Sequence, residues 1–277
     1  MSTITAIGQQ AIAFIGGGNM ASAIIGGLLR EGLAPAQIEV VEPFAEARLR
    51  LQSQFGVQAQ EHAGPALGRA QLVVWAVKPQ TFKQAALQAR SHTGKALHLS
   101  VAAGIRSDSI AAWLGTERIV RSMPNTPALV GKGMTALFAR PAVTAADRDL
   151  VEQVIATTGE SLWVQDEKQL DAVTALSGSG PAYVFFFLEA MTKAGVEMGL
   201  SPQQAHQLAV GTFVGASELA RASDEAPEVL RQRVTSKGGT TYAAIASMEQ
   251  DQVQALFAKA LHAANTRARE LGDEFGA

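Results

Sequence analysis

Short apolar runs alternate with alanine-rich amphipathic stretches along the first part of the chain. Each run is nearly continuous in its apolar residues, with little of the alternation seen in strands that have one solvated face. Continuous runs are typical of strands in a parallel sheet that helices cover on both faces. The pattern predicts such strands at residues 11–15, 38–41, 72–77, 96–99 and 118–121.

The strand pattern continues a little further and then stops. Runs at residues 134–138 and 161–164 flank a helix that Thr144 is placed to open, so they extend the sheet. After Asp166 we find no further strand pattern. We therefore expect an α/β fold, with a doubly wound sheet domain over residues 1–165 and an all-helical domain over residues 166–277.

Prolines mark the helices of the second domain. Helices are expected to begin at Pro181, Pro202 and Pro227, because proline is tolerated in the first turn of a helix. Residues 182–188 are apolar all round, and a helix without a polar face must be buried on every side. The helical domain is small, so a subunit interface can supply the missing cover. A central core helix is the alternative.

Two uncharged stretches, residues 1–29 and 172–188, resemble a secretory leader and a membrane helix at first sight. The first has no basic residues ahead of its apolar part, as a leader requires. Glycines and a proline interrupt the second, which falls short of the roughly 20 continuous apolar residues that a spanning helix needs. We expect neither a leader nor a membrane partner.

Composition excludes several further classes. Of the 277 residues 47% are hydrophobic and 17% charged, which is typical of a folded globular protein. The net charge is -2 and no basic stripe is present, so nucleic-acid binding is disfavoured. Cysteine is absent, which rules out thiolate chemistry and fits a reducing cytoplasm. The five histidines are scattered, so no metal site is expected, and His98 is interpreted as a core residue of its strand.

A glycine loop follows the first strand and opens the first helix. It has the pattern Gly-x-Gly-x-x-Ala, at Gly16, Gly18 and Ala21. Gly16 allows a tight turn, Gly18 allows a pyrophosphate to approach the backbone, and Ala21 allows close packing of helix on strand. A glycine turn without a ligand is the alternative. The strand before the loop and the helix after it favour a Rossmann-type dinucleotide site, with the pyrophosphate at the helix N-terminus.

Glu42 ends the second strand, where an acidic residue can hold the ribose 2′-hydroxyl of NAD. The same carboxylate would repel the 2′-phosphate of NADP, by about 4 kcal/mol per charge pair at about 4 Å and a dielectric constant near 20. Arg48 can offset this repulsion. The alternative is that Glu42 only begins a solvated helix.

Four further segments are more specific than the glycine loop. They are residues 75–79 (WAVKP), 121–128 (RSMPNTPA), 175–183 (ALSGSGPAY) and 234–241 (VTSKGGTT). In this order, and over residues 11 to 270, the chain resembles the pyrroline-5-carboxylate reductase family.

The resemblance implies reduction of 1-pyrroline-5-carboxylate to L-proline, the last step of proline biosynthesis, by NADPH or NADH. It also implies a homodimer that interlocks through the helical domain, and in many members a ring of five dimers. The cofactor would contact Gly16, Gly17, Gly18, Asn19, Met20, Ala21, Ala76, Val77, Lys78 and Pro79, and the substrate would lie at Ser236, Gly238, Gly239, Thr240 and Thr241. Many NADPH-preferring relatives have a small or polar residue where this chain has Glu42, which leaves the cofactor preference open.

Reduction of a cyclic imine requires little acid–base machinery, because a protonated iminium already attracts hydride. Gly238-Gly239-Thr240 precedes a predicted helix and forms a turn that can bind the substrate carboxylate. The Thr241 hydroxyl is the first candidate for contact with the ring nitrogen, and Ser236 is the second. Asn125, in a proline-rich turn, either orients the nicotinamide or serves the turn alone.

Two alternative functions remain open at this point. A β-hydroxyacid dehydrogenase would use a catalytic lysine on the long helix of the second domain, where Lys193 lies, but it would leave residues 235–241 unexplained. A non-catalytic dinucleotide-binding regulator would need no second anion-binding turn.

Overall fold

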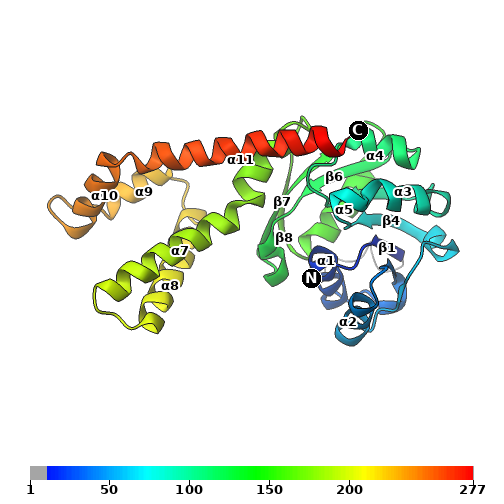
Figure 1. The fold of residues 1–277 in the computed structure, drawn as a ribbon, viewed down its shortest axis with the longest axis horizontal. Helices are drawn as coiled ribbons and strands as arrows, with labels where there is room; N and C mark the ends of the chain where they lie inside the picture. The colour runs from blue at the N-terminus through cyan, green and yellow to red at the C-terminus, as the bar shows by residue number, and fades with distance from the viewer. Residues whose placement is uncertain (1–10, 277) are drawn as a thin grey trace. The chain divides into compact units, whose positions relative to one another are not determined.

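The computed structural model describes residues 11–276 (Figure 1). Part of the uncharged N-terminal stretch lies outside them. The first region contains β1 (Ala11–Ile15), α1 (Asn19–Arg30), β2 (Ile38–Val41), α2 (Ala45–Phe55), β3 (Ala59–Gln60), β4 (Ala70–Trp75), α3 (Pro79–Thr93), β5 (Leu97–Ser100), α4 (Ser107–Leu114), β6 (Ile119–Met123), β7 (Gly133–Ala139), α5 (Ala145–Ala156) and β8 (Gly159–Trp163).

These strands form one eight-stranded sheet in the order β3-β2-β1-β4-β5-β6-β7-β8. All neighbouring strands pair in parallel except β6 and β7, which pair antiparallel. The strand order changes direction between β1 and β4: β2 and β3 lie on one side of β1, and β4 and the later strands lie on the other. In open α/β sheets, ligands bind at the carboxyl ends of the strands beside such a switch point.

The central strands of the sheet are buried on both faces, which explains their continuous apolar runs. On one face Phe14 and Val74 belong to a core with residues of α1, α2 and α5. On the other face Ile15 and Val73 belong to a core with residues of α3 and α4. Neighbouring residues of one strand therefore bury their side chains in different cores. The doubly wound sheet predicted from the sequence is confirmed.

The second region is helical. It contains α6 (Gln169–Val173), the π-helical turn η4 (Thr174–Gly178), α7 (Gly180–Glu197), α8 (Pro202–Arg221), α9 (Pro227–Arg233), α10 (Thr240–Gln250) and α11 (Val253–Phe275). Among the described residues, none of these helices is long and apolar enough to cross a membrane.

Local sequence explains where two helices begin. Thr144 caps α5 by accepting from the Asp147 backbone amide, and the Asp147 carboxylate accepts from the Thr144 amide in return. Ser201 and Gln204 form the same reciprocal cap ahead of Pro202 in α8. The expected start points at Thr144 and Pro202 therefore rest on specific backbone hydrogen bonds.

The chain divides into two compact units that differ from a simple split in sequence. Among the described residues, the first unit contains residues 11–179 and 264–276, and the second contains residues 180–263. In the first unit, the end of α11 packs beside α4: Phe275 contacts the core on that face, and Arg106 Nη2 donates to Asp273 Oδ1 at 2.6 Å. The boundary at residue 165 stays a prediction.

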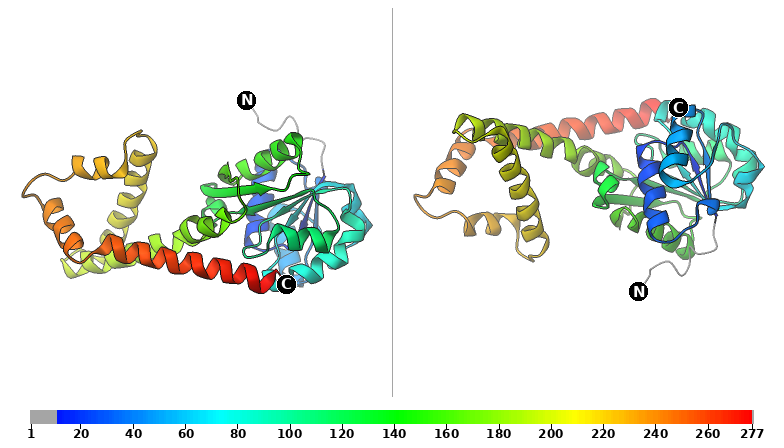
Figure 2. Two further views of the ribbon diagram at one scale, coloured as in Figure 1. Left: turned by 90° about the horizontal axis from the view of Figure 1, so that it is seen from above. Right: turned by 90° about the horizontal axis from the view of Figure 1, so that it is seen from below.

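The helical unit has almost no interior of its own. Within residues 180–263, the described residues that are buried are Gly195, Ala205 and Ala209. Helices α7 and α8 pack against each other there, with a turn between them (Figure 2). Large apolar side chains on the same helices stay exposed, among them Phe185 at 59% and Phe186 at 67%. The apolar segment expected to need cover is uncovered in a single chain.

Candidate active site

The glycine loop lies where β1 meets its two neighbours in the sheet. Gly16 has φ +97°, and its amide donates to the Val41 carbonyl at 2.8 Å. A Cβ on Gly16 would lie 2.5 Å from the Ala76 carbonyl oxygen. Only glycine suits this position, for its conformation and for the close approach of the next strand.

Gly18 faces open space. Its backbone is extended, with φ −74° and ψ −169°, and a Cβ added there would meet nothing within 4 Å. The backbone amides of the following first turn have no acceptor inside the helix until Ser22, which donates to Gly18 at 2.9 Å. Ala21 is fully buried against the core. An open surface in front of free helical amides fits a pyrophosphate.

Glu42 is buried, with 6% of its surface exposed, so it does not begin a solvated helix. Its Oε2 accepts from the Gly17 amide at 2.7 Å, and its Oε1 accepts from the Phe44 amide at 2.9 Å. The carboxylate therefore joins the glycine loop to the loop that follows β2.

Arg48 does not form an ion pair with the Glu42 side chain. Its Nη1 donates to the backbone carbonyls of Glu42 at 2.9 Å and Pro43 at 2.7 Å. Its Nη2 pairs with Glu61 at 3.0 Å. The guanidinium thus holds the backbone of the same loop, and its charge is already paired with the Glu61 carboxylate.

The segment after β4 forms the second wall of the candidate cofactor site. Ala76 and Val77 are half-buried, and the Ala76 amide donates to Ile15 at 2.8 Å. Lys78 is exposed and precedes Pro79, the first residue of α3. The Lys78 carbonyl accepts from the Thr81 amide at 3.0 Å, so the backbone at Lys78 shapes the start of the helix.

Both the nitrogen and the oxygen of the Asn125 side-chain amide form hydrogen bonds within the first unit. Its Nδ2 donates to the carbonyl and the hydroxyl oxygens of Ser177, at 3.2 and 3.1 Å, and its Oδ1 accepts from the Met134 amide at 2.9 Å. These bonds support the alternative in which Asn125 serves the turn. They also tie the proline-rich turn to the π-helical turn, and such turns are frequent at functional sites.

The loop that follows β5 was not among the site segments predicted from the sequence. Residues 101–103 lie at the carboxyl end of a parallel strand, the same edge as the glycine loop, and the Val101 amide donates to the Trp75 carbonyl at 3.1 Å. The small residues Ala102, Ala103 and Gly104 directly after a buried strand are the pattern from which this loop could have been predicted.

The histidine in that strand is a core residue, as expected. His98 is 1% exposed, and its Nδ1 accepts from Trp75 Nε1 at 3.0 Å. Burial lowers the pKa of His98 to about 4. The imidazole is therefore neutral at ordinary pH.

The second candidate site lies in the helical unit, at the start of α10. Gly238 has φ +74°, and a Cβ there would meet nothing within 4 Å. Gly239 caps the helix, and its amide donates to the Ser236 carbonyl at 3.0 Å. The first amide bonded within the helix is that of Ala243, so the preceding amides of the first turn remain open to an anion. Thr241 is half-buried in this turn and Ser236 is exposed.

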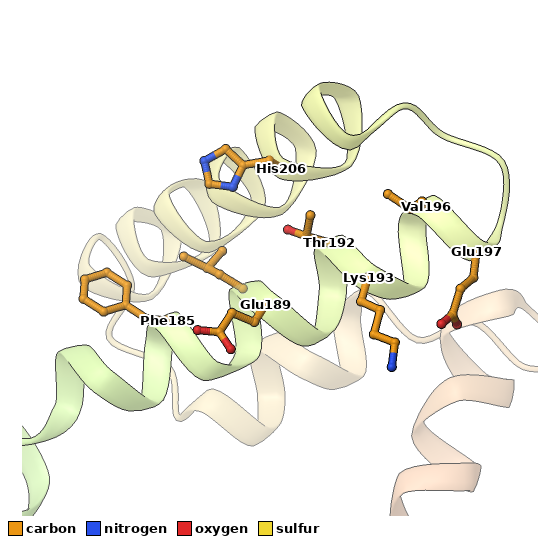
Figure 3. Close-up of a pocket in the computed structure, with 8 residues that line it drawn as sticks. Phe185, Glu189, Thr192, Lys193, Val196, Glu197 and His206 are labelled. Carbon is orange, nitrogen blue, oxygen red and sulfur yellow. The ribbon is translucent and has the colours of Figure 1, made fainter.

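Lys193 belongs to a different feature. It lines an open hollow of about 670 Å³ between α7 and α8, with Phe185, Glu189 and His206 (Figure 3). The hollow is largely apolar and no residue of the 235–241 segment lines it. A catalytic lysine there would act away from the open amides at the start of α10.

Comparison with known proteins identifies the family. Residues 167–271 match the family model for pyrroline-5-carboxylate reductase dimerisation, and residues 11–104 match the model for NADP oxidoreductase, coenzyme F420-dependent. The pyrroline-5-carboxylate reductase of Pseudomonas aeruginosa is 46% identical over 268 residues, which cover 96% of this chain and 98% of that protein. The chain belongs to the pyrroline-5-carboxylate reductase family.

Other family members agree along nearly the whole chain. The reductase of Haemophilus influenzae is 40% identical, covering 95% of this chain and 98% of that protein. The solved pyrroline-5-carboxylate reductase of Coxiella burnetii has a TM-score of 0.88 and 38% identity, covering 95% of this chain and 98% of that one. The solved enzyme of Plasmodium falciparum, with NADP bound, has a TM-score of 0.86 and 26% identity, covering 95% and 98%.

These relatives confirm what the motifs predicted: an NAD(P)-dependent oxidoreductase with pyrroline-5-carboxylate reductase function. The dimerisation model over the helical region supports a homo-oligomer that acts on a small molecule. The hydroxyacid dehydrogenase and the non-catalytic regulator gain no support from these relatives.

Proposed function

We propose that this chain transfers a hydride from NAD(P)H to the C=N carbon of 1-pyrroline-5-carboxylate and releases L-proline. The observation that carries the proposal is the pair of glycine turns, each followed by a helix whose first amides are open. One turn suits a pyrophosphate and the other suits a carboxylate. An enzyme that reduces a carboxylate-bearing imine with a dinucleotide needs both.

In the helical unit, the open amides at the start of α10 hold the substrate carboxylate. Gly238 leaves room for it, because the space beside its Cα is open. The Thr241 hydroxyl contacts the ring nitrogen, and Ser236 is the weaker second candidate. These groups position the ring, since a hydride donor and acceptor must come within about 3 to 3.5 Å to react.

In the sheet unit, residues 16–21 hold the pyrophosphate, and residues 76–79 with the loop after β5 line the rest of the cofactor trough. NAD(P)H supplies the hydride when it is bound. The iminium nitrogen already carries its proton, so the chain has no proton to deliver before the transfer. The buried Glu42 carboxylate lies at the end of β2, and we expect its charge to favour NADH over NADPH.

Assembly through the helical unit completes the proposal. Phe185 and Phe186 lie exposed on a helix whose unit has hardly any core, so a second copy gives them cover. A homodimer therefore forms there. The family resemblance implies a further state, a decamer of five dimers. The functional division is at residues 1–165 and 166–277. The location is the cytoplasm, whose reducing environment suits a chain without cysteine.

The test is to measure oxidation of NADH and of NADPH separately, with 1-pyrroline-5-carboxylate and with a 3-oxo acid. We expect oxidation with the imine alone and L-proline as the product, identified by chromatography. Turnover of the 3-oxo acid without turnover of the imine would refute the proposal.

A further inference from the structure

The carboxylate of Glu42 is the link between two loops at the adenosine end of the cofactor site. One oxygen accepts from the Gly17 amide at 2.7 Å and the other from the Phe44 amide at 2.9 Å. Gly17 is itself buried, and a Cβ on it would lie 3.4 Å from both Cβ and Cγ of Glu42. The side chain is thus packed against the glycine loop as well as bonded to it.

Glu42 Oε2 is the acceptor that the structure shows for the buried Gly17 amide. A buried amide that loses its partner must admit water or rotate its peptide plane. Rotation at Gly17 would move the backbone on either side, at Gly16 and Gly18, where the pyrophosphate cradle begins. The conformation of the cradle therefore depends on an acceptor at the position of Glu42 Oε2.

The two hydrogen bonds from backbone amides do not use all the acceptor capacity of the Glu42 carboxylate, nor do they cancel its charge. Each carboxylate oxygen has a second lone pair, so Glu42 can hold both amides and still accept a ribose hydroxyl. Its negative charge is not cancelled by an ion pair with Arg48, whose Nη atoms bond to two backbone carbonyls and to Glu61. Geometry and charge are therefore separable contributions of one residue.

We propose that Glu42 is a positioning residue for the dinucleotide: it holds the Gly17 amide so that the glycine loop keeps the shape that binds pyrophosphate, for either cofactor. This inference rests on the proposed function in taking the glycine loop as the cofactor site. It separates a loop-positioning effect, shared by NADH and NADPH, from a charge effect that acts on the 2′-phosphate alone.

The experiment compares Glu42→Ala, Glu42→Gln and a matched control, Glu46→Gln. Glu46 is exposed in the first turn of α2, so its substitution removes the same charge nearby without touching the loop. For each folded protein we would measure the dissociation constants of NADH and NADPH by fluorescence titration, without the second substrate. Amide hydrogen exchange over residues 14–22 in the free protein and the melting temperature complete the set.

Glu42→Ala should weaken NADH by about 10- to 100-fold and speed exchange at Gly17, because both hydrogen bonds to a charged acceptor are lost. NADPH should also bind more weakly, but by less, because the repulsive charge is lost as well. Glu42→Gln keeps one acceptor and should weaken NADH by only about 2- to 5-fold, while its NADPH-to-NADH preference rises because the charge is gone. Glu46→Gln should match the wild type in every measurement.

Two results would overturn the inference. One is a folded Glu42→Ala protein that binds both cofactors like the wild type. The other is a change confined to NADPH with unaltered exchange at Gly17, which would leave charge as the only role. If Glu42→Ala does not fold, Glu42→Gln decides, since unchanged NADH affinity and exchange would refute positioning. None of these measurements needs the imine, so they stay valid if the wild type fails to reduce it.

Discussion

Replacing Gly18 by valine should abolish tight cofactor binding and leave the fold intact. The backbone at Gly18 is extended, with φ −74° and ψ −169°, a conformation that any residue adopts. A Cβ there meets nothing within 4 Å, so valine would project into the open space that we assign to the pyrophosphate. Gly18 also caps α1, and valine is a poorer cap, which should cost up to about 1 kcal/mol of stability.

The cost to cofactor binding should be much larger. A side chain in front of the first turn keeps the pyrophosphate away from the open amides of α1. Hydrogen bonds to a charged group contribute about 1.5 to 3 kcal/mol each, so losing two costs about 3 to 6 kcal/mol. That corresponds to roughly 10²- to 10⁴-fold weaker binding. Gly18→Ala, with a smaller side chain, should lose less.

Fluorescence titration with NADH and NADPH, together with kcat/KM for each cofactor, measures this effect. Gly64→Val is a matched control, because Gly64 also caps a helix in an extended conformation, with φ −158° and ψ −178°, and has open space at its Cβ. Gly64→Val should keep the cofactor affinity of the wild type. Wild-type affinity in a folded Gly18→Val protein would show that the pyrophosphate binds elsewhere.

Thr241→Ala should lower kcat/KM for the imine by roughly 10- to 100-fold, and Lys193→Ala should be nearly silent; the reverse pattern in folded proteins would contradict the assignment. Light scattering at about 1 μM should find at least a dimer, and Phe186→Asp should release smaller species; a fully active wild-type monomer would argue against the helical interface. Burial lowers the pKa of His98 to about 4, whereas the imidazole of the unfolded chain has the ordinary pKa near 6.5 and takes up a proton below it. The free energy of unfolding should therefore fall as the pH drops from about 6.5 to about 4, by up to about 3 kcal/mol from this residue. Denaturation curves of His98→Gln, which can still accept from Trp75, should show a weaker acid loss; equal losses would be inconsistent with a buried neutral histidine.

The strands of the sheet were predictable because burial on both faces leaves a continuous apolar run in each one. Strand β3 was missed, since it contains only Ala59 and Gln60 and two residues form no pattern. The packing of Phe275 at the end of α11 against the first unit was not predicted, for a different reason. Its packing beside α4 is a tertiary contact, and nothing near Phe275 in the sequence marks its distant partner.

The candidate site shows the same division between local and non-local information. The turns at Gly16 and Gly238 were expected, and both have the positive φ that favours glycine. The bond between Glu42 and the Gly17 amide could not be read from spacing, because it depends on two loops meeting at one edge of the sheet. The same holds for Asn125, whose partners at Ser177 and Met134 lie in other elements.

The discontinuous first unit has a consequence for how the protein is made. The N-terminus of a chain leaves the ribosome first, yet residues 264–276 belong to the same compact unit as the glycine loop. The sheet unit therefore reaches its final contacts only when the last helix has emerged, after the whole inserted helical unit. A premature stop that removes Asp273 and Phe275 would act at a distance in sequence, on the face of the sheet covered by α4.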